Sequence, residues 1–371
     1  MFGRNSSLNR PIHGGNLAWA AALAGCPPVA ILDFSASINP LGPPESAIAA
    51  IASHLEALKA YPDPDYYQLR ADLSQVHQIP PDWILPGNGS AELLTWAGWD
   101  LAKLAATCLI TPAFSDYWRA LKAFETNVLE CPLGIGDWGT GKFKTLPMPH
   151  APCPMPYAPC PKDCGLLLNN PHNPTGQMWS RESILPYLEQ FALVVVDEAF
   201  MDFLRPDEQQ SLISVVQDYP NLVILRSLTK FYSLPGLRLG YAIAHPDRLR
   251  CWQERRDPWP VNALAAAAGS AVVQDLDFQE QTWTWLASAR SQLFQGLAEL
   301  PGLQPYSSAA NFLLVKSKLP SSQVQEKLLK HSQILIRDCL SFPELGDRYF
   351  RVAVRSEADN LRLLAGLAAI L

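Results

Sequence analysis

One short stretch of the chain brings together a lysine, two hydroxyl side chains and an arginine. Ser227, Thr229 and Lys230 follow the apolar run 222–225, which predicts a buried strand, and Arg238 lies eight residues beyond the lysine. Ligands bind α/β sheets at the carboxyl ends of their strands. A lysine there can form a Schiff base with an aldehyde, and the hydroxyls and the arginine can hold a phosphate. Taken alone, the stretch also fits a solvated surface loop.

Two more polar residues follow predicted strands. Asp197 comes directly after the run 193–196, which is the most strand-like in the chain, and Asn173 follows the apolar run 166–168. A carboxylate at this position also fits a helix cap, and an isolated asparagine is typical of a turn. The carboxyl ends of parallel strands share one edge of a sheet, so we expect Asn173, Asp197 and Lys230 to lie close together.

The helix predicted to begin at Ser90 and Ala91 follows a Gly-Ser turn. The free N–H groups of such a helix start can bind an anion, although most turns of this kind are ordinary helix caps. An aromatic residue is also expected to stack on any planar ligand. Phe114 is the candidate for this contact, with Tyr117 as the alternative.

A ligand with an aldehyde, a ring nitrogen and a phosphate would use all of these groups, and pyridoxal 5'-phosphate has those parts. Lys230 is then the catalytic amine, and Asp197 is the catalytic acid that keeps the ring nitrogen protonated. Asn173 can donate to the ring oxygen. The residues expected around the phosphate are Ser90, Ala91, Ser227, Thr229 and Arg238.

Strands and helices alternate through the middle of the chain, which predicts an α/β fold with a mostly parallel central sheet covered by helices. The last part has an α+β pattern that is typical of a separate, smaller domain. We expect a large domain over residues 50–260 and a small domain formed by both termini, residues 1–49 and 261–371. Residues 147–161 contain seven prolines and predict an irregular surface excursion.

Composition narrows the class of protein. The 371 residues are 48% hydrophobic and 17% charged, which is enough to bury a sizeable core, and the net charge of -6 with dispersed basic residues argues against nucleic acid as a partner. The apolar run before Cys26 is too short for a signal peptide, and no stretch is long enough to span a membrane. The eight scattered cysteines favour reduced thiols and a cytoplasmic protein. The spacing of Cys153, Cys160 and Cys164 fits no usual zinc pattern, so no metal is predicted.

The motifs also occur in a characteristic order. Asn-Pro-x-Asn-Pro-Thr-Gly at 170–176 is followed by Asp-Glu-Ala at 197–199, Ser-x-x-Lys at 227–230 and Arg238. This order resembles fold-type I pyridoxal phosphate enzymes and, more narrowly, the histidinol-phosphate aminotransferase group. The resemblance covers nearly the whole chain and implies the fold-type I transferase architecture, usually as a homodimer.

Within that group, the chain most resembles the L-threonine O-3-phosphate decarboxylases of cobalamin biosynthesis. The resemblance is carried by residues 13–16, 33–42, 336–339 and 350–355, and by Phe200, where the aminotransferases usually have a tyrosine. It implies that Tyr61 reaches a cofactor phosphate across a dimer interface. The substrate-binding residues that it implies are His13, Gly14, Asn39, Asn173, Arg337 and Arg351.

The implied substrate carries a carboxylate and a phosphate, and two arginines suit such a molecule. The expected product is (R)-1-aminopropan-2-yl phosphate. An aminotransferase acting on histidinol phosphate or an aromatic amino acid is the alternative, because the same cofactor serves both reactions. Which arginine binds which anion is left open by the sequence.

Overall fold

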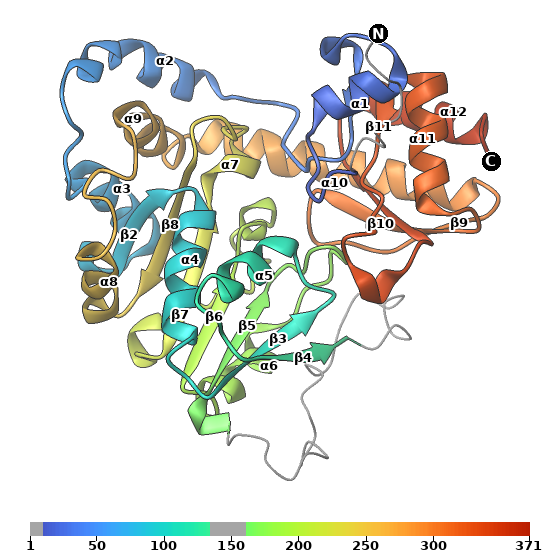
Figure 1. Cartoon of the computed structure of the whole chain (residues 1–371). Coiled ribbons are helices and arrows are strands. Elements are labelled where there is room, and N and C mark those ends of the chain that lie inside the picture. Colours follow the sequence, from blue (N-terminus) through green and yellow to red (C-terminus); the bar gives the residue numbers. More distant parts are fainter. Residues whose placement is uncertain (1–9, 134–160) are drawn as a thin grey trace, which may run out of the picture.

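The computed structural model describes residues 10–133 and 161–371. A seven-stranded sheet lies at the centre of its larger part, in the order β2-β8-β7-β6-β5-β3-β4 (Figure 1). β8 runs antiparallel to both of its neighbours, and the other pairings are parallel. The strands are β2 Ile84–Asn88, β3 Ala106–Thr111, β4 Val128–Pro132, β5 Cys164–Asn169, β6 Leu193–Asp197, β7 Leu222–Ser227 and β8 Leu239–Ala244. The prediction of a mostly parallel sheet is therefore confirmed.

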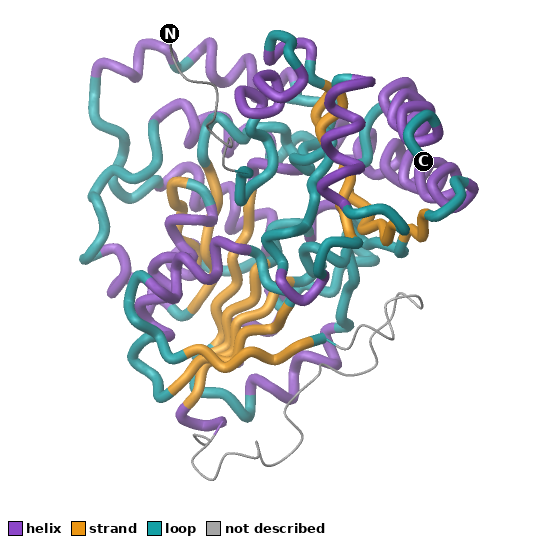
Figure 2. The backbone as a smooth tube through the Cα atoms, turned by 45° about the vertical axis from the view of Figure 1, so that its right-hand side comes forward, coloured by secondary structure: helices purple, strands orange, loops and turns teal. Residues whose placement is uncertain are grey.

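Both faces of this sheet are buried, as its near-continuous apolar strands require. Along β6, Val194 and Val196 belong to one hydrophobic cluster, whereas Val195 between them belongs to the cluster on the other face. The helices of this part are α2 Glu45–Ser53, α3 Tyr67–His77, α4 Ser90–Leu101, α5 Ser115–Lys122, α6 Arg181–Leu188, α7 Leu228–Phe231, α8 Pro246–Gln253 and α9 Ala263–Val272. Figure 2 shows the strands side by side with helices around them.

The smaller part is built from segments near both ends of the chain, which are coloured dark blue and red in Figure 1. A two-stranded parallel sheet pairs β1 with β11, and a three-stranded antiparallel sheet has the order β12-β10-β9. Its strands are β1 Leu32–Asp33, β9 Leu303–Pro305, β10 Phe312–Ser317, β11 Ile334–Leu335 and β12 Tyr349–Ala353. Its helices are α1 Leu17–Ala24, α11 Ser321–Ser332 and α12 Glu357–Ala368, and the long α10 Leu276–Glu299 joins it to the larger part.

Short 3₁₀ helices connect several of these elements. They are η1 Pro28–Ala30, η2 Leu55–Lys59, η3 Pro81–Trp83, η5 Pro161–Asp163, η6 Met201–Phe203, η7 Ile213–Asp218 and η8 Pro343–Leu345. The domain limits at residues 49 and 261 stay a prediction. α9 packs against α2 and α3, which puts this helix beside the large sheet.

Some local expectations were wrong. From the sequence, Lys230 was expected in a loop at the carboxyl end of the strand 222–225. It lies instead in the one-turn helix α7, because Ser227 caps that turn by accepting from Thr229 N. The strand β2 was missed since it contains Pro86, which disfavours a strand assignment; β2 is an edge strand, where proline is tolerated. A strand was expected around Arg337, but β11 ends at Leu335, and Arg337 forms an isolated bridge with Arg351.

Other expectations fall partly or wholly outside the described ranges. Most of the proline-rich stretch 147–161 lies there, as do Cys153 and Cys160. Within the described ranges, no group of histidine, cysteine and acidic side chains is arranged to hold a metal ion. No helix in those ranges combines the length and the apolarity needed to cross a membrane.

Candidate active site

Three strand ends and one short helix meet at the carboxyl edge of the large sheet. β5 ends at Asn169, which pairs in register with Asp197 at the end of β6, and Asp197 in turn pairs with Leu225 of β7. Lys230 follows β7 by one turn of α7, with its Nζ 3.5 Å from Ser227 Oγ. The predicted convergence of the lysine and the aspartate at one sheet edge is therefore observed.

Burial perturbs both of these charged groups. Loss of water lowers the pKa of the Lys230 amine, and the nearby Arg238 and Arg351 lower it further, while Asp197 opposes the change. Burial raises the pKa of Asp197, against the opposing effects of Lys230 and of two hydrogen bonds. Those bonds are donated by Tyr117 OH to Oδ2, at 2.8 Å, and by Ala199 N to Oδ1, at 2.9 Å. A lysine with a lowered pKa has more of the neutral amine that attacks a carbonyl.

Lys230 and Asp197 face a cavity of about 260 Å³ between the two parts of the molecule. That volume far exceeds the roughly 30 Å³ that one water occupies in the liquid. The other lining residues include Ser90, Phe114, Tyr117, Asn169, Asn173, Ala199 and Phe200 from the larger part, and His13, Gly14, Arg351 and residues 35–38 from the smaller part. Phe114 contacts Tyr117 edge to face, at 5.8 Å between ring centroids.

The groups predicted to hold a phosphate adjoin this cavity. A β-carbon added to Gly240, which pairs with Ser227, would lie 2.6 Å from Ser90 N, so β8 touches the first turn of α4. A β-carbon added to Gly89 would lie 2.5 Å from Arg238 Nη2, which puts this guanidinium beside the same helix start. The hydroxyls of Ser227 and Thr229 are 2.7 Å apart. Ala91 follows Ser90 in the first turn of α4.

Arg351 enters the cavity from β12. Its guanidinium donates to Asn173 Oδ1 at 2.5 Å and to Ser35 O at 3.2 Å, and lies 4.6 Å from the centre of the Phe312 ring. Arg351 Nε has no hydrogen-bond partner among the described residues. Burial lowers the pKa of this arginine to about 10. It therefore remains a cation at neutral pH, in a place where an anion would stabilise it.

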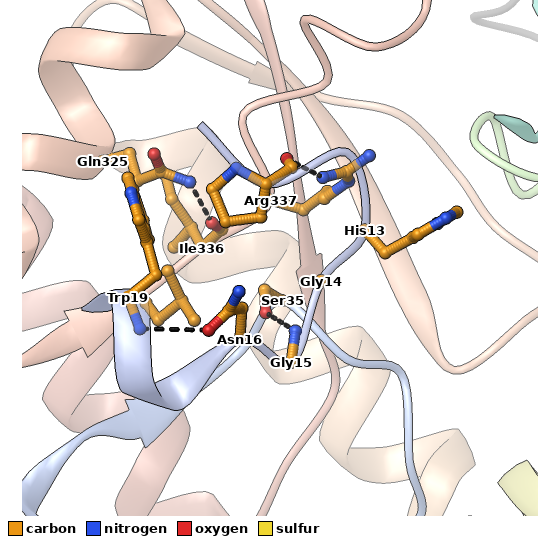
Figure 3. Close-up of a pocket in the computed structure, with 11 residues that line it drawn as sticks. His13, Gly14, Gly15, Asn16, Trp19, Ser35, Gln325, Ile336 and Arg337 are labelled. Carbon is orange, nitrogen blue, oxygen red and sulfur yellow. Dashed lines mark hydrogen bonds between the residues drawn. The ribbon is translucent and has the colours of Figure 1, made fainter. Parts of the chain in front are cut away.

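Arg337 lies at a smaller, adjoining pocket of about 10 Å³, which Figure 3 shows in close-up. Its guanidinium donates to the backbone oxygens of Pro11 and Ile12 and to Ser341 Oγ. This arginine thus holds the segment before α1. His13, in that segment, lines both pockets, and its Nδ1 is 3.2 Å from Ser115 Oγ at the start of α5.

Asn39 and Tyr61 are also absent from the cavity wall. Asn39 Nδ2 donates to Phe231 O and Thr282 Oγ1, and its backbone N donates to Lys230 O, so it fastens its loop to the lysine turn. Tyr61 is 77% exposed and stacks on Trp259, away from the cavity. The roles proposed for Asn39, Tyr61 and Arg337 remain predictions.

Sequence reasoning missed the contact between Tyr117 and Asp197, since it assigned Tyr117 only as an alternative stacking ring. It also missed Ser35, whose Oγ accepts from Gly15 N at 2.8 Å while its backbone oxygen accepts from Arg351. The only signal for Ser35 was its place inside the 33–42 motif. The contact of Tyr117 had no signal in the sequence, because it depends on how α5 is rotated against β6.

Comparison with known proteins assigns this architecture to a family. The model of aminotransferase class I and II matches residues 29–367. The chain belongs to this family. The match spans all three sheets and most of the residues around the cavity, and the architecture is that of fold-type I enzymes.

Three similar proteins are informative. The chain is 39% identical to a threonine-phosphate decarboxylase of Salmonella typhimurium, over 98% of each chain. It is 31% identical to an adenosylcobalamin biosynthesis bifunctional protein of Leptospira interrogans, over 98% of this chain and 41% of that protein. A crystal structure of histidinol-phosphate aminotransferase from Sinorhizobium meliloti, in complex with pyridoxal-5'-phosphate, superposes with a TM-score of 0.82 at 22% identity. That superposition covers 100% of this chain and 98% of the other.

The residues present fit the cofactor predicted from the sequence. An amine with a lowered pKa and a carboxylate with two fixed hydrogen bonds face one cavity. A helix start, two hydroxyls and an arginine adjoin it, and together they form the donor set that a phosphate requires.

Proposed function

We propose that this protein is a pyridoxal 5'-phosphate-dependent decarboxylase that converts L-threonine O-3-phosphate to (R)-1-aminopropan-2-yl phosphate in cobalamin biosynthesis. The observation that carries the proposal is the full-length similarity to a threonine-phosphate decarboxylase, at 39% identity. The similarity to an adenosylcobalamin biosynthesis protein supports the pathway. The presence of Phe200 in the cavity wall, where a tyrosine hydroxyl is usual in the aminotransferases, agrees with this choice.

Several residues would hold the cofactor. Lys230 would bond its aldehyde carbon, Asp197 would hold the proton on its ring nitrogen, and Asn173 would donate to its ring oxygen. Its phosphate would lie among Ser90, Ala91, Ser227, Thr229 and Arg238, with Tyr61 supplied by a second copy of the chain. When bound, the cofactor supplies a conjugated ring that takes up the electron pair left on the substrate α-carbon.

The polar residues of the smaller part would bind the substrate. Arg351 offers a cationic group inside the cavity, and its contact with Asn173 Oδ1 leaves the amide nitrogen of that asparagine available to the cavity. His13 and Gly14 approach from the segment that Arg337 holds. Lys230 Nζ is a nitrogen base beside the same space, so it can return a proton to the substrate α-carbon after carbon dioxide leaves.

The experiment uses the purified, cofactor-loaded protein with L-threonine O-3-phosphate and no 2-oxo acid. Release of carbon dioxide with one equivalent of aminopropanol phosphate is expected. Conversion of the cofactor to its amine form, reversed by 2-oxoglutarate, would favour the aminotransferase instead. Lys230→Ala is the control, since it should lose both the visible absorption band of the lysine-bound cofactor and the activity.

We also propose that the protein is a homodimer. Large apolar side chains are exposed together near η2 and α9, among them Leu55, Leu58, Tyr61, Tyr67 and Trp259. A groove of about 410 Å³ lies beside Tyr61, with mostly alanine and aromatic walls. Exposed apolar patches of this kind mark protein interfaces, and a second copy would cover this one. Sedimentation at twice the 40.9 kDa chain mass is the expected result. A cytoplasmic location remains a prediction from the cysteine content alone.

A further inference from the structure

Tyr117 is buried in the larger part, and its hydroxyl donates to the side chain of Asp197. We propose that Tyr117 is a positioning residue, which fixes the orientation of Asp197 and keeps its carboxylate charged opposite the ring nitrogen of the cofactor. The proposal rests on the cofactor assignment made above. It goes beyond that assignment because it names the residue that sets how strongly Asp197 holds a proton.

The geometry of the carboxylate carries the argument. Asp197 Oδ2 accepts from Tyr117 OH at 2.8 Å, and Oδ1 accepts from Ala199 N at 2.9 Å. One donor on each oxygen prevents rotation of the group about its Cβ–Cγ bond. A carboxylate has about four acceptor positions, so both oxygens retain capacity for a donor in the cavity. The two contacts therefore fix the direction from which a ring N–H can approach.

The fold makes Tyr117 a rigid support. It is the third residue of α5, it is 2% exposed, and its backbone N donates to Phe114 O at 3.0 Å. Phe114 contacts the tyrosine ring edge to face, and α5 packs along α4. The hydroxyl is thus held by two helices and does not depend on a mobile loop. A residue held in this way can keep an acid in place during catalysis without moving itself.

The surrounding charges show why such a donor is needed. Burial raises the pKa of Asp197, which on its own would favour a neutral acid. Lys230 from α7, Tyr117 and the Ala199 N–H oppose this effect, whereas Asp116 on α5 adds to it. Burial and the adjacent Asp197 raise the pKa of Tyr117 well above its ordinary value, so the tyrosine stays a hydrogen-bond donor at any pH of interest.

Removal of the hydroxyl should have a distinct signature. Without the Tyr117 donor, the negative charge of Asp197 is less dispersed, so it stabilises the cationic groups opposite it more strongly. The pH midpoint of the visible spectrum of the loaded enzyme should therefore rise, by roughly one pH unit for a lost hydrogen bond to a charged group. The carboxylate also loses one of the two contacts that fix its orientation, and this misplacement of the acid should lower kcat by roughly tenfold.

The test compares Tyr117→Phe with Tyr187→Phe in the cofactor-loaded protein. Tyr187 lies in α6 against Phe191 and does not line the cavity, so its variant removes the hydroxyl of a half-buried tyrosine outside the site. We expect an upward shift of the spectral midpoint in the first variant and no shift in the second. In an Asp197→Asn background, Tyr117→Phe should leave the spectral midpoint unchanged, because the carboxylate through which Tyr117 acts on the cofactor is gone.

A second measurement keeps the proposal testable if Tyr117→Phe folds poorly. Incorporation of 3-fluorotyrosine at position 117 preserves the shape and makes the phenol a stronger donor, so the midpoint should fall. An unmoved midpoint in both proteins, beside a normal visible band, would overturn the role of Tyr117. A wild-type protein with no visible cofactor band would instead overturn the proposed function, so the two failures are distinguishable.

Discussion

Arg351 is a cationic side chain in the cavity wall, and we propose that it binds an anionic group of the substrate. The variant Arg351→Met tests this role directly. Burial lowers the pKa of Arg351 well below its ordinary value, to about 10, so the buried cation is destabilised by roughly 3 kcal/mol. A substrate anion beside it would offset that destabilisation. We therefore expect kcat/KM for L-threonine O-3-phosphate to fall on the order of 100- to 1,000-fold when the charge is removed.

The assay is carbon dioxide release over a range of substrate concentrations, with Arg355→Met as the matched control. Arg355 also lies over an aromatic ring, 5.8 Å from the centre of Phe34, and donates to Asp359 at 3.1 Å. It is not among the residues that line the cavity. The kcat/KM of Arg351→Lys should lie between those of Arg351→Met and Arg355→Met, because lysine keeps the positive charge but lacks the planar guanidinium. A kcat/KM for Arg351→Met within threefold of the control would refute the assignment.

Three further predictions follow from the buried charges. Asp197→Asn should retain the cofactor and lower kcat roughly 100- to 1,000-fold in the same assay, and a near-normal rate would remove Asp197 from its role. Arg226 is buried and pairs with Glu198 and Asp202. Arg226→Met should therefore lower the free energy of unfolding by roughly 3–5 kcal/mol, measured in urea titrations, because it leaves buried carboxylates without their partner. Addition of Glu198→Gln to this variant should restore part of the lost stability. Burial lowers the pKa values of His77 and His172 to about 3. The imidazoles of the unfolded chain take up protons near pH 6.5, whereas the folded protein keeps both histidines neutral down to about pH 3. The free energy of unfolding should therefore be highest above pH 6.5 and fall towards pH 3, by up to ~2.7 kcal/mol per pH unit for the two histidines together. An unchanged urea midpoint between pH 7 and pH 5 would contradict this.

The positions of Asp197 and Lys230 could be predicted because each follows a run of buried strand residues. The rule that ligands bind at the carboxyl ends of parallel strands then brings Asp197 and Lys230 together without any knowledge of packing. The observed register of Asn169, Asp197 and Leu225 agrees with that expectation.

Contacts that depend on tertiary packing could not be predicted in the same way. The side chain of Tyr117 could point towards the cofactor ring or towards Asp197. Which of these it does depends on the rotation of α5 about its axis, and packing of α5 against α4 and β6 determines that rotation. Arg337 is similar: its side chain turns to the carbonyl groups of Pro11 and Ile12, which are more than 300 residues away in sequence. No spacing rule relates such distant segments, so the sequence alone left both contacts open.

The residues proposed to bind the cofactor and the arginine proposed to bind the substrate come from different parts of the molecule, and a hydrogen bond joins the two parts. Lys230, Asp197 and Ser90 lie on the large sheet and its helices, whereas Arg351 lies on β12 of the smaller part. The bond from Arg351 to Asn173 Oδ1 crosses from one part to the other over 178 residues of sequence. With the roles proposed above, Arg351 would bind the substrate and Asn173 would donate to the cofactor ring. The bond between these two side chains would then link substrate recognition to the contact with the ring.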